Sequence, residues 1–498
     1  MSSSEEHPSV SLVRRRWITA GLLLGMSLGA LEATVVGTAM PTIIATLGGL
    51  SHYSWVFSAY LLTSTATVPI WGRLSDLFGR RRIYLLGVAF FLVGSVLAGA
   101  ADSMPVLILA RAIQGLGTGA IIPLSMTIVG ELYELSERAR AQALFSGVWG
   151  LASIAGPLVG GYITDSLSWR WVFYINLPFG LLAFAVIAFA YPPMRLLRQV
   201  RVDWAGAALL FAGISTLLVA IGGEMGAFAP WLAASIVLLA LFVHVERRAP
   251  EPILPMDLLR TPVMSSSLLV VFLVGFALFG AIAFIPLYVQ TVIGGTATQA
   301  GQVLTPLFLG WVTMSIVGAR ATVRLGYRIV AITGSALMTV GFIGLTMLSA
   351  ESSRAVLFAW CAIVGSGMGL QMLSLLLAVQ HGVARSRLGI ATSLSQFSRS
   401  VGAAVGVAAM GALLTRGLHG APMPQAGQAM DVTALSLPLR LLFADALHQV
   451  FLAGAVVSGA GLVATLFLPA VDFERRIEST RPEPATSDPR LEAEAVGD

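Results

Sequence analysis

A single carboxylate interrupts a long apolar stretch near the start of the sequence. Glu32 lies in the run from Trp17 to Pro41, which is otherwise apolar or small and is long enough to cross a bilayer. A charged side chain at the centre of a membrane helix costs about 2.5–3.5 kcal/mol on insertion scales. A carboxyl group that is neutral when sealed and ionised when wetted can carry a proton and attract a cation. We therefore predict that Glu32 couples proton movement to substrate binding; the alternative is a structural Glu paired with a neighbouring helix.

Two further polar residues lie together inside another apolar run. Arg111 and Gln114 are separated by about one helical turn, so they share one face of a helix over residues 106–130. We predict that they line a central cavity with Glu32, where Arg111 tunes the carboxylate or contacts the substrate. In the alternative, the Arg111 side chain extends to the outer headgroups.

The loop "GRLSDLFGRRR" over residues 72–82 combines glycines that allow tight turns with charges of both signs. Its aspartate can pair with an arginine of the same loop or of a neighbouring helix end. Such a cluster would hold two halves of the protein together in one state and break in the other, whereas the simpler alternative is a positively charged loop with a solvated ion pair. The residues of this predicted cytoplasmic gate are Gly72, Arg73, Asp76, Gly79, Arg80, Arg81 and Glu131.

Small residues dominate the segment "GVWGLASIAGPLVGGYI" over residues 147–163. Small side chains let helices approach closely, and a proline removes a backbone hydrogen bond and can kink the helix. This pattern indicates either ordinary tight packing or a flexible contact that controls an outer seal. The residues that carry it are Gly147, Gly150, Gly156, Pro157, Gly160 and Gly161.

Composition places these residues in lipid. Of 498 residues, 56% are hydrophobic and 11% are charged, whereas soluble domains carry about 25% charged residues. All basic residues are arginines in short clusters between apolar runs, which favours membrane topology over nucleic-acid binding. Fourteen runs are long enough to span a bilayer: 17–40, 54–72, 83–101, 106–130, 141–163, 171–191, 204–222, 229–246, 264–290, 302–320, 328–348, 355–379, 390–415 and 447–468.

The placement of arginine predicts the orientation of these spans. The arginine clusters follow the even-numbered runs, and the loops after odd-numbered runs hold only Arg170, Arg354, Arg416 and Arg440. By the positive-inside rule both termini are cytoplasmic, which an even number of spans also requires. The segment "ALSLPLRLLFADALHQ", residues 434–449, predicts a short interfacial helix outside.

An internal repeat predicts the domain organisation. Superposing Gly79 on Gly326 aligns the loop after the second run with the loop after the tenth, and Val323 then falls where Asp76 stands. We expect an all-α membrane protein of fourteen transmembrane helices, in which two six-helix bundles are related by pseudo-twofold symmetry. The expected divisions are a cytoplasmic N-terminus 1–16, a first bundle 17–191, two inserted helices with linkers 192–263, a second bundle 264–469 and a disordered cytoplasmic tail 470–498.

Several motifs resemble those of the major facilitator superfamily, in particular its fourteen-helix drug:proton antiporter branch. They are the loop 72–82, "LARAIQGLGTGA" at 109–120, the glycine-rich segment 147–163, "LEATVVGTAMPTI" at 31–43 and "WRWVFYINLPFG" at 169–180. Two departures matter. The branch usually has Asp where Glu32 stands, and the loop of the second half lacks its acid.

The resemblance implies a proton-coupled antiporter that exports amphipathic small molecules, cations among them, such as drugs, dyes or antibiotics. Its expected location is a bacterial cytoplasmic membrane, and its expected partners are the substrate, protons and the lipid bilayer. The alternative is a proton-coupled transporter of a specific metabolite, siderophore or nutrient. The sequence has no H-E-x-x-H, P-loop, paired intramembrane Asp or His cluster, so we predict no enzyme, cofactor or metal site. Nucleic acid is not an expected partner, and whether a periplasmic adaptor is required stays open.

Overall fold

The computed structural model describes residues 11–133, 135–192, 203–222, 228–249, 254, 256–349, 351–381, 383, 388–419 and 435–469. Within these ranges the chain is helical and contains no strand. The predicted tail 470–498 and most of the predicted N-terminal segment lie outside the described residues. The helices of the first half are α1 (Leu12–Leu47), α2 (Tyr53–Ala66), α3 (Val68–Phe78), α4 (Arg80–Ala100), α5 (Met104–Leu132), α6 (Leu135–Ser166), α7 (Trp171–Tyr174) and α8 (Asn176–Ala190).

Eight further helices follow in the described part of the chain. Short 3-10 turns occur at Leu50–His52 and Leu258–Arg260. The later helices are α9 (Trp204–Gly222), α10 (Phe228–Glu246), α11 (Pro262–Thr291), α12 (Ala297–Leu325), α13 (Tyr327–Thr346), α14 (Arg354–His381), α15 (Leu388–Gly417) and α16 (Leu437–Leu466).

Within the described part of the chain, twelve helical segments are long and apolar enough to cross a membrane. The two other predicted spans are also helical. The run 54–72 is divided between α2 and α3, because Pro69 has no N–H to continue the α2 hydrogen-bond ladder and instead lies in the first turn of α3. The run 141–163 lies within α6. The count of fourteen spans therefore stays a prediction.

One predicted element is wrong. The segment 434–449 does not form a separate interfacial helix, because α16 begins at Leu437 and continues without a break to Leu466. Pro438 sits in the first turn of α16, where its missing N–H costs no intrahelical bond, and nothing interrupts the helix afterwards.

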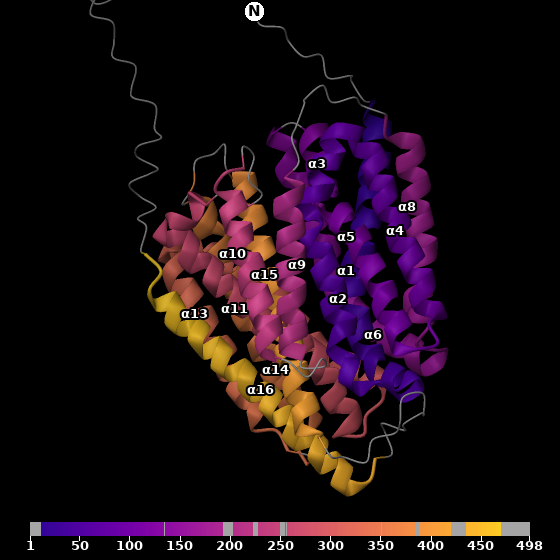
Figure 1. Cartoon of the computed structure of the whole chain (residues 1–498), viewed down its shortest axis with the longest axis vertical. Helices are drawn as coiled ribbons and strands as arrows, with labels where there is room; N and C mark the ends of the chain where they lie inside the picture. Colours follow the sequence, from indigo (N-terminus) through magenta and orange to yellow (C-terminus); the bar gives the residue numbers. More distant parts are fainter. Residues whose placement is uncertain are drawn as a thin grey trace, which may run out of the picture.

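Helices α1–α8 gather on one side of the molecule and α11–α16 on the other (Figure 1). The two groups meet where α1 contacts α11, where α6 contacts α12 and where α2 contacts α15. Helix α9 packs against α2 and α15 at the edge of this junction, and α10 packs against α9. Little of α10 is buried, which suits a helix that faces lipid.

The packing repeats between the two groups. Alternate glycines of α5 contact the backbone of α2 and α4 at three positions, Gly115, Gly117 and Gly119. Alternate glycines of α14 contact α12 and α13 in the same way at Gly365, Gly367 and Gly369. Gly79 before α4 and Gly326 before α13 also match, with φ of 91° and 79° that only glycine adopts easily. Small residues at these places let the helix backbones approach closely.

Candidate functional site

Glu32 and Arg111 form an ion pair inside the first half of the molecule. Arg111 Nη1 donates to Glu32 Oε1, and the two residues are 1% and 2% exposed respectively. Arg111 also donates from Nη1 to Gln114 Oε1 (2.5 Å) and from Nε to the carbonyl of Val56 (3.2 Å), and its guanidinium lies 4.2 Å from the centre of the Tyr60 ring. The predicted cavity residues are thus brought together, and Arg111 does not extend to headgroups.

Asn176 is the member of this site that the sequence did not single out. Its Nδ2 donates to Glu32 Oε2 (2.7 Å) and lies 3.4 Å from Ser95 Oγ, to which Gln114 Nε2 also donates (2.9 Å). Asn176 is the first residue of α8 and is buried. The available signal was its rarity, since it is the single asparagine in the sequence.

These contacts define the Glu32 cluster, which consists of Glu32, Ser95, Arg111, Gln114 and Asn176. The cluster connects α1, α4, α5 and α8. Both carboxylate oxygens of Glu32 accept hydrogen bonds, and the guanidinium compensates its charge. A buried ion pair is tolerated only with such additional hydrogen bonds. Glu32 is almost fully buried, so a proton or a cation can reach it only after the surrounding groups move.

The predicted gate forms a charged cluster at the arginine-rich end of the helices. Arg80 pairs with Asp76, and its Nε donates to Glu131 Oε1 (2.9 Å). Arg81 donates to the carbonyl of Ala188 on α8. Arg73 lies on α3 and is partly buried. In the described part of the structure, the partners of Arg80 and Arg81 all belong to the first half of the molecule. An ion pair that joins this gate to the second half therefore stays a prediction, for a different conformation of the transporter.

The predicted turn at Gly72 is wrong. Gly72 lies inside α3, which ends at Phe78, and the turn with a positive φ occurs only at Gly79. The chain instead bends at Thr67, between α2 and α3.

The glycine motif of α6 faces two partners. Gly156 and Gly160 pack against Thr34 and Thr38 of α1. Pro157 and Gly161 pack against the start of α12, where a Cβ on Gly161 would lie 2.5 Å from the carbonyl oxygen of Ala297. Further toward the arginine-rich end, a Cβ on Gly150 would be 3.6 Å from Val312, and one on Gly147 would meet nothing within 4 Å. On the glycine face of α6, the contact with α12 therefore weakens from Gly161 toward Gly147.

The opposite end is sealed by hydrogen bonds between the halves. Asp165 of α6 accepts from the backbone N–H groups of Ala297 (3.1 Å) and Thr298 (2.8 Å). Gln290 Nε2 donates to the carbonyl of Thr38 (3.0 Å).

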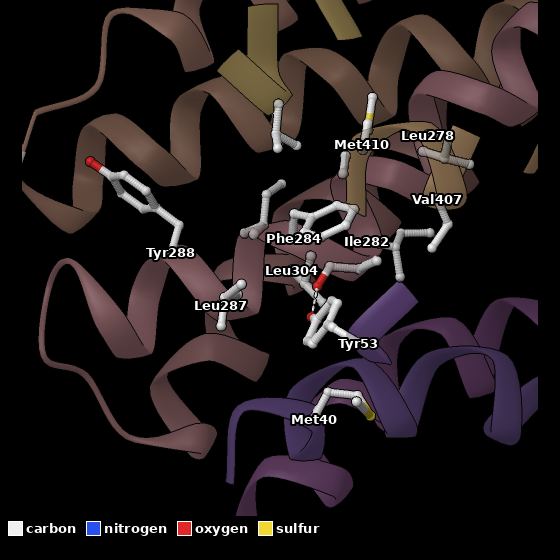
Figure 2. Packing of buried hydrophobic residues seen from close by; sticks show 14 of the residues in the cluster. Met40, Tyr53, Leu278, Ile282, Phe284, Leu287, Tyr288, Leu304, Val407 and Met410 are labelled. Atoms are coloured by element: carbon white, nitrogen blue, oxygen red, sulfur yellow. Dashed lines mark hydrogen bonds between the residues drawn. The ribbon is translucent and has the colours of Figure 1, made fainter. Parts of the chain in front are cut away.

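An apolar layer completes this seal. The Tyr53 hydroxyl donates to the carbonyl of Ala283, and the Tyr53 ring lies against Phe284 (Figure 2). Met40 of α1 lies beside Tyr53, while Leu278, Ile282 and Phe284 are presented from α11 on the other side of the contact (Figure 2). The two halves are thus joined by hydrogen bonds and apolar packing at one end of the helices, and the contact between the glycine face of α6 and α12 weakens toward the other end.

A sequence model described as the Major Facilitator Superfamily matches residues 22–407. The chain belongs to this superfamily. It is 40% identical over 408 residues to the multidrug transporter protein MdtP of Bacillus subtilis, covering 80% of this chain and 75% of that protein. It is 34% identical over 495 residues to the efflux pump dotC of Dothistroma septosporum, covering 92% and 84% of the two chains.

The fold of this superfamily member is also found among solved transporters. A bacterial homolog of the human lysosomal transporter Spinster, in an inward-facing and occupied conformation, matches 95% of this chain and 100% of its own with a TM-score of 0.67 and 16% identity. The protein is therefore a multi-pass membrane transporter of this superfamily. In the part of the chain that the structure describes, no group of three or more His, Cys, Asp or Glu side chains could hold a metal ion.

Proposed function

We propose that this chain is a proton-coupled antiporter that exports amphipathic small molecules across a bacterial cytoplasmic membrane by alternating access. The names of MdtP and dotC as multidrug transporter and efflux pump support the direction and the substrate breadth. The observation that carries the proton coupling is the buried Glu32–Arg111 pair with Asn176 on the second carboxylate oxygen. Glu32 is the titratable acid of the cluster, and the groups that face it are Arg111, Gln114, Asn176 and the more distant Tyr60.

The proposed architecture has fourteen spans, in which α2 and α3 together form one span and α6 forms another. Two six-helix bundles, 17–191 and 264–469, face each other, and α9 and α10 belong to the insertion 192–263. The repeated glycine contacts of α5 and α14 support the pairing of the bundles. We place the arginine-rich end in the cytoplasm by the positive-inside rule. On this placement both termini are cytoplasmic, and the structure is sealed on the outside.

Coupling follows from the contacts that hold α1. In the state described here, α1 is bonded to α5 and α8 through Glu32 and to α11 through Thr38. Opening the outer seal breaks the α1–α11 contact and admits water toward Glu32. Protonated Glu32 loses its ionic attraction for Arg111, so the cluster rearranges and the transporter returns with a proton in place of substrate. Competition between proton and substrate for one cluster is sufficient for antiport.

The test uses inverted vesicles with an imposed pH gradient and a fluorescent substrate. Wild-type vesicles should accumulate the dye, and an uncoupler should collapse the accumulation. Glu32→Gln keeps the side-chain size and removes the titratable group, so uphill transport should be lost while downhill exchange survives. A membrane potential contributes about 2.3 kcal/mol per charge per 100 mV, so the loss of one coupled proton is visible as a smaller final gradient.

Two results would reject the proposal. Accumulation that resists an uncoupler would remove proton coupling, and full proton-driven export by Glu32→Gln would move the coupling site away from this cluster. Dye movement in the opposite direction, with the proton, would instead identify an uptake transporter. Glu32→Asp retains the carboxylate and should keep part of the activity.

A further inference from the structure

The second half of the molecule carries a charged side chain inside the membrane, Arg399 of α15. It follows the start of α15 at Leu388 by eleven residues, or about 16 Å along the helix. An ionisable residue at such a depth is rare because hydrocarbon solvates charge poorly, and such residues usually serve a pathway or a ligand. Arg399 belongs to none of the contacts described above.

The side chain of Arg399 points away from lipid. Phe397 and Val401, two positions before and after it, pack against the apolar cluster that α15 shares with α9. Each step of two residues turns a helix by about 200°, so Arg399 lies on the opposite face. There its Nη1 lies 3.6 Å from Met372 Sδ of α14, and its carbonyl oxygen packs against Gly275 of α11. The guanidinium therefore lies among α11, α14 and α15, and its side chain remains partly exposed.

The surroundings of Arg399 and Arg111 differ in charge. Arg111 has Glu32, Gln114 and a backbone carbonyl as acceptors. In the described ranges, no carboxylate lies within ion-pair distance of Arg399, and its hydrogen-bond acceptor is a thioether sulfur, which is a weak one. The Glu32–Arg111 pair has no net charge, whereas no carboxylate among the described residues compensates the positive charge of Arg399.

We propose that Arg399 binds an anionic group of the transported molecule, a carboxylate, in the state sealed at the outer end. This inference rests on the proposed export function and narrows its substrate class to amphipathic acids and zwitterions. The planar guanidinium fork matches a carboxylate with two parallel hydrogen bonds. Met372 beside it offers an adaptable apolar surface for the body of such a molecule. A simple lipophilic cation would meet the same positive charge and bind less well.

The test compares two dyes that differ at one group. Rhodamine 110 carries a free carboxylate, and rhodamine 123 is its methyl ester. Fluorescence polarisation with the purified full chain should give a lower Kd for the carboxylate dye. Arg399→Gln should raise that Kd at least tenfold and leave the Kd of the ester within about twofold, with Arg399→Lys in between. Arg324→Gln, at an exposed arginine near the end of α12, is the control and should change neither value.

A second variant tests the same charge without removing Arg399. Met372→Glu places a carboxylate beside the guanidinium, so it should abolish the preference for the carboxylate dye and spare the ester. The proposal would be overturned if Arg399→Gln or Met372→Glu still bound the carboxylate dye more tightly than the ester. It would also be overturned if either variant weakened the binding of both dyes equally, or if the wild-type protein bound the ester more tightly. If the preference behaves as expected but a pH gradient drives no export, the anion site stands and the proton-coupled function fails.

Discussion

The two halves of the molecule share the same close contacts between helices but differ in the buried side chains that lie beside those contacts. Gly94 of α4 contacts the backbone of Gln114, and Gly341 of α13 contacts the backbone of Val364 in the same manner. With this register, Arg111 corresponds to Cys361 and Ser95 to Phe342, and all of these side chains are buried. The first half therefore holds a charged cluster where the second half is apolar. The close helix contacts depend on glycine and occur with either kind of side chain, so this packing does not require charge at these positions.

Breaking the ion pair should give the largest effect on stability. Arg111→Met leaves Glu32 buried without its counter-charge, and such losses cost about 3–5 kcal/mol. Cys361→Ala at the corresponding position removes only a small apolar group and should cost about 1 kcal/mol. Thermal unfolding in detergent, followed by tryptophan fluorescence, measures both.

A double variant separates charge from packing. Adding Glu32→Gln to Arg111→Met removes the unpaired charge, so most of the lost stability should return. If Cys361→Ala is as damaging as Arg111→Met, or if the double variant is no better than the single, the contrast between the halves is not electrostatic.

The seal offers a second contrast, within α6. Gly161→Val places a side chain against Ala297 and should open the outer end, whereas Gly147→Val meets open space and should leave the equilibrium unchanged. Met40→Cys in a Cys361→Ser background reports the opening, since Met40 is buried in the seal. A membrane-impermeant maleimide added from outside should label Met40→Cys several-fold faster with Gly161→Val than with Gly147→Val. Equal labelling would show that this glycine does not control the seal.

The hydrogen bond from Asn176 gives a smaller and more specific effect. Asn176→Leu removes the donor to Glu32 Oε2, and hydrogen bonds to charged groups are worth about 1.5–3 kcal/mol. The pH at which transport is half-maximal should therefore move by about one unit or more. The matched control is Gln371→Leu in the second half, whose Nε2 donates to Ser335 in a network without a charge. Gln371→Leu should reduce stability and leave the pH dependence of transport unchanged. If both variants shift the pH dependence of transport, the role of Asn176 is only structural.

Sequence patterns predicted the helices and the repeat because both depend on local composition and on fixed offsets. The register of Gly79 on Gly326 is confirmed by their matching turns. The contact between Glu32 and Arg111 joins residues 79 positions apart. The sequence predicted that both residues line one cavity, but no local pattern fixes a direct contact between two separate helices. Asn176 was missed because its role depends on α8 packing against α1, a tertiary contact with no local signature. The chain bends at Thr67 and not at Gly72, because Pro69 lies in the first turn of a new helix, two residues after Thr67.

The gate should show the smallest effect on stability and a clear one on rate. Asp76 and Arg80 are partly exposed, so Asp76→Asn should change the free energy of unfolding by no more than about 1 kcal/mol. Arg80 keeps Glu131 as a partner, which limits the loss of stability further.

If the gate contributes to closing the cytoplasmic end in another state, Asp76→Asn should slow transport several-fold while binding of a dye in detergent persists. Arg320→Gln, at the corresponding loop of the second half where Val323 replaces the acid, should slow transport less. If Asp76→Asn transports at the normal rate, the ion pairs of residues 72–82 do not join the two halves during the transport cycle. The charges of this segment would then only orient the protein in the membrane.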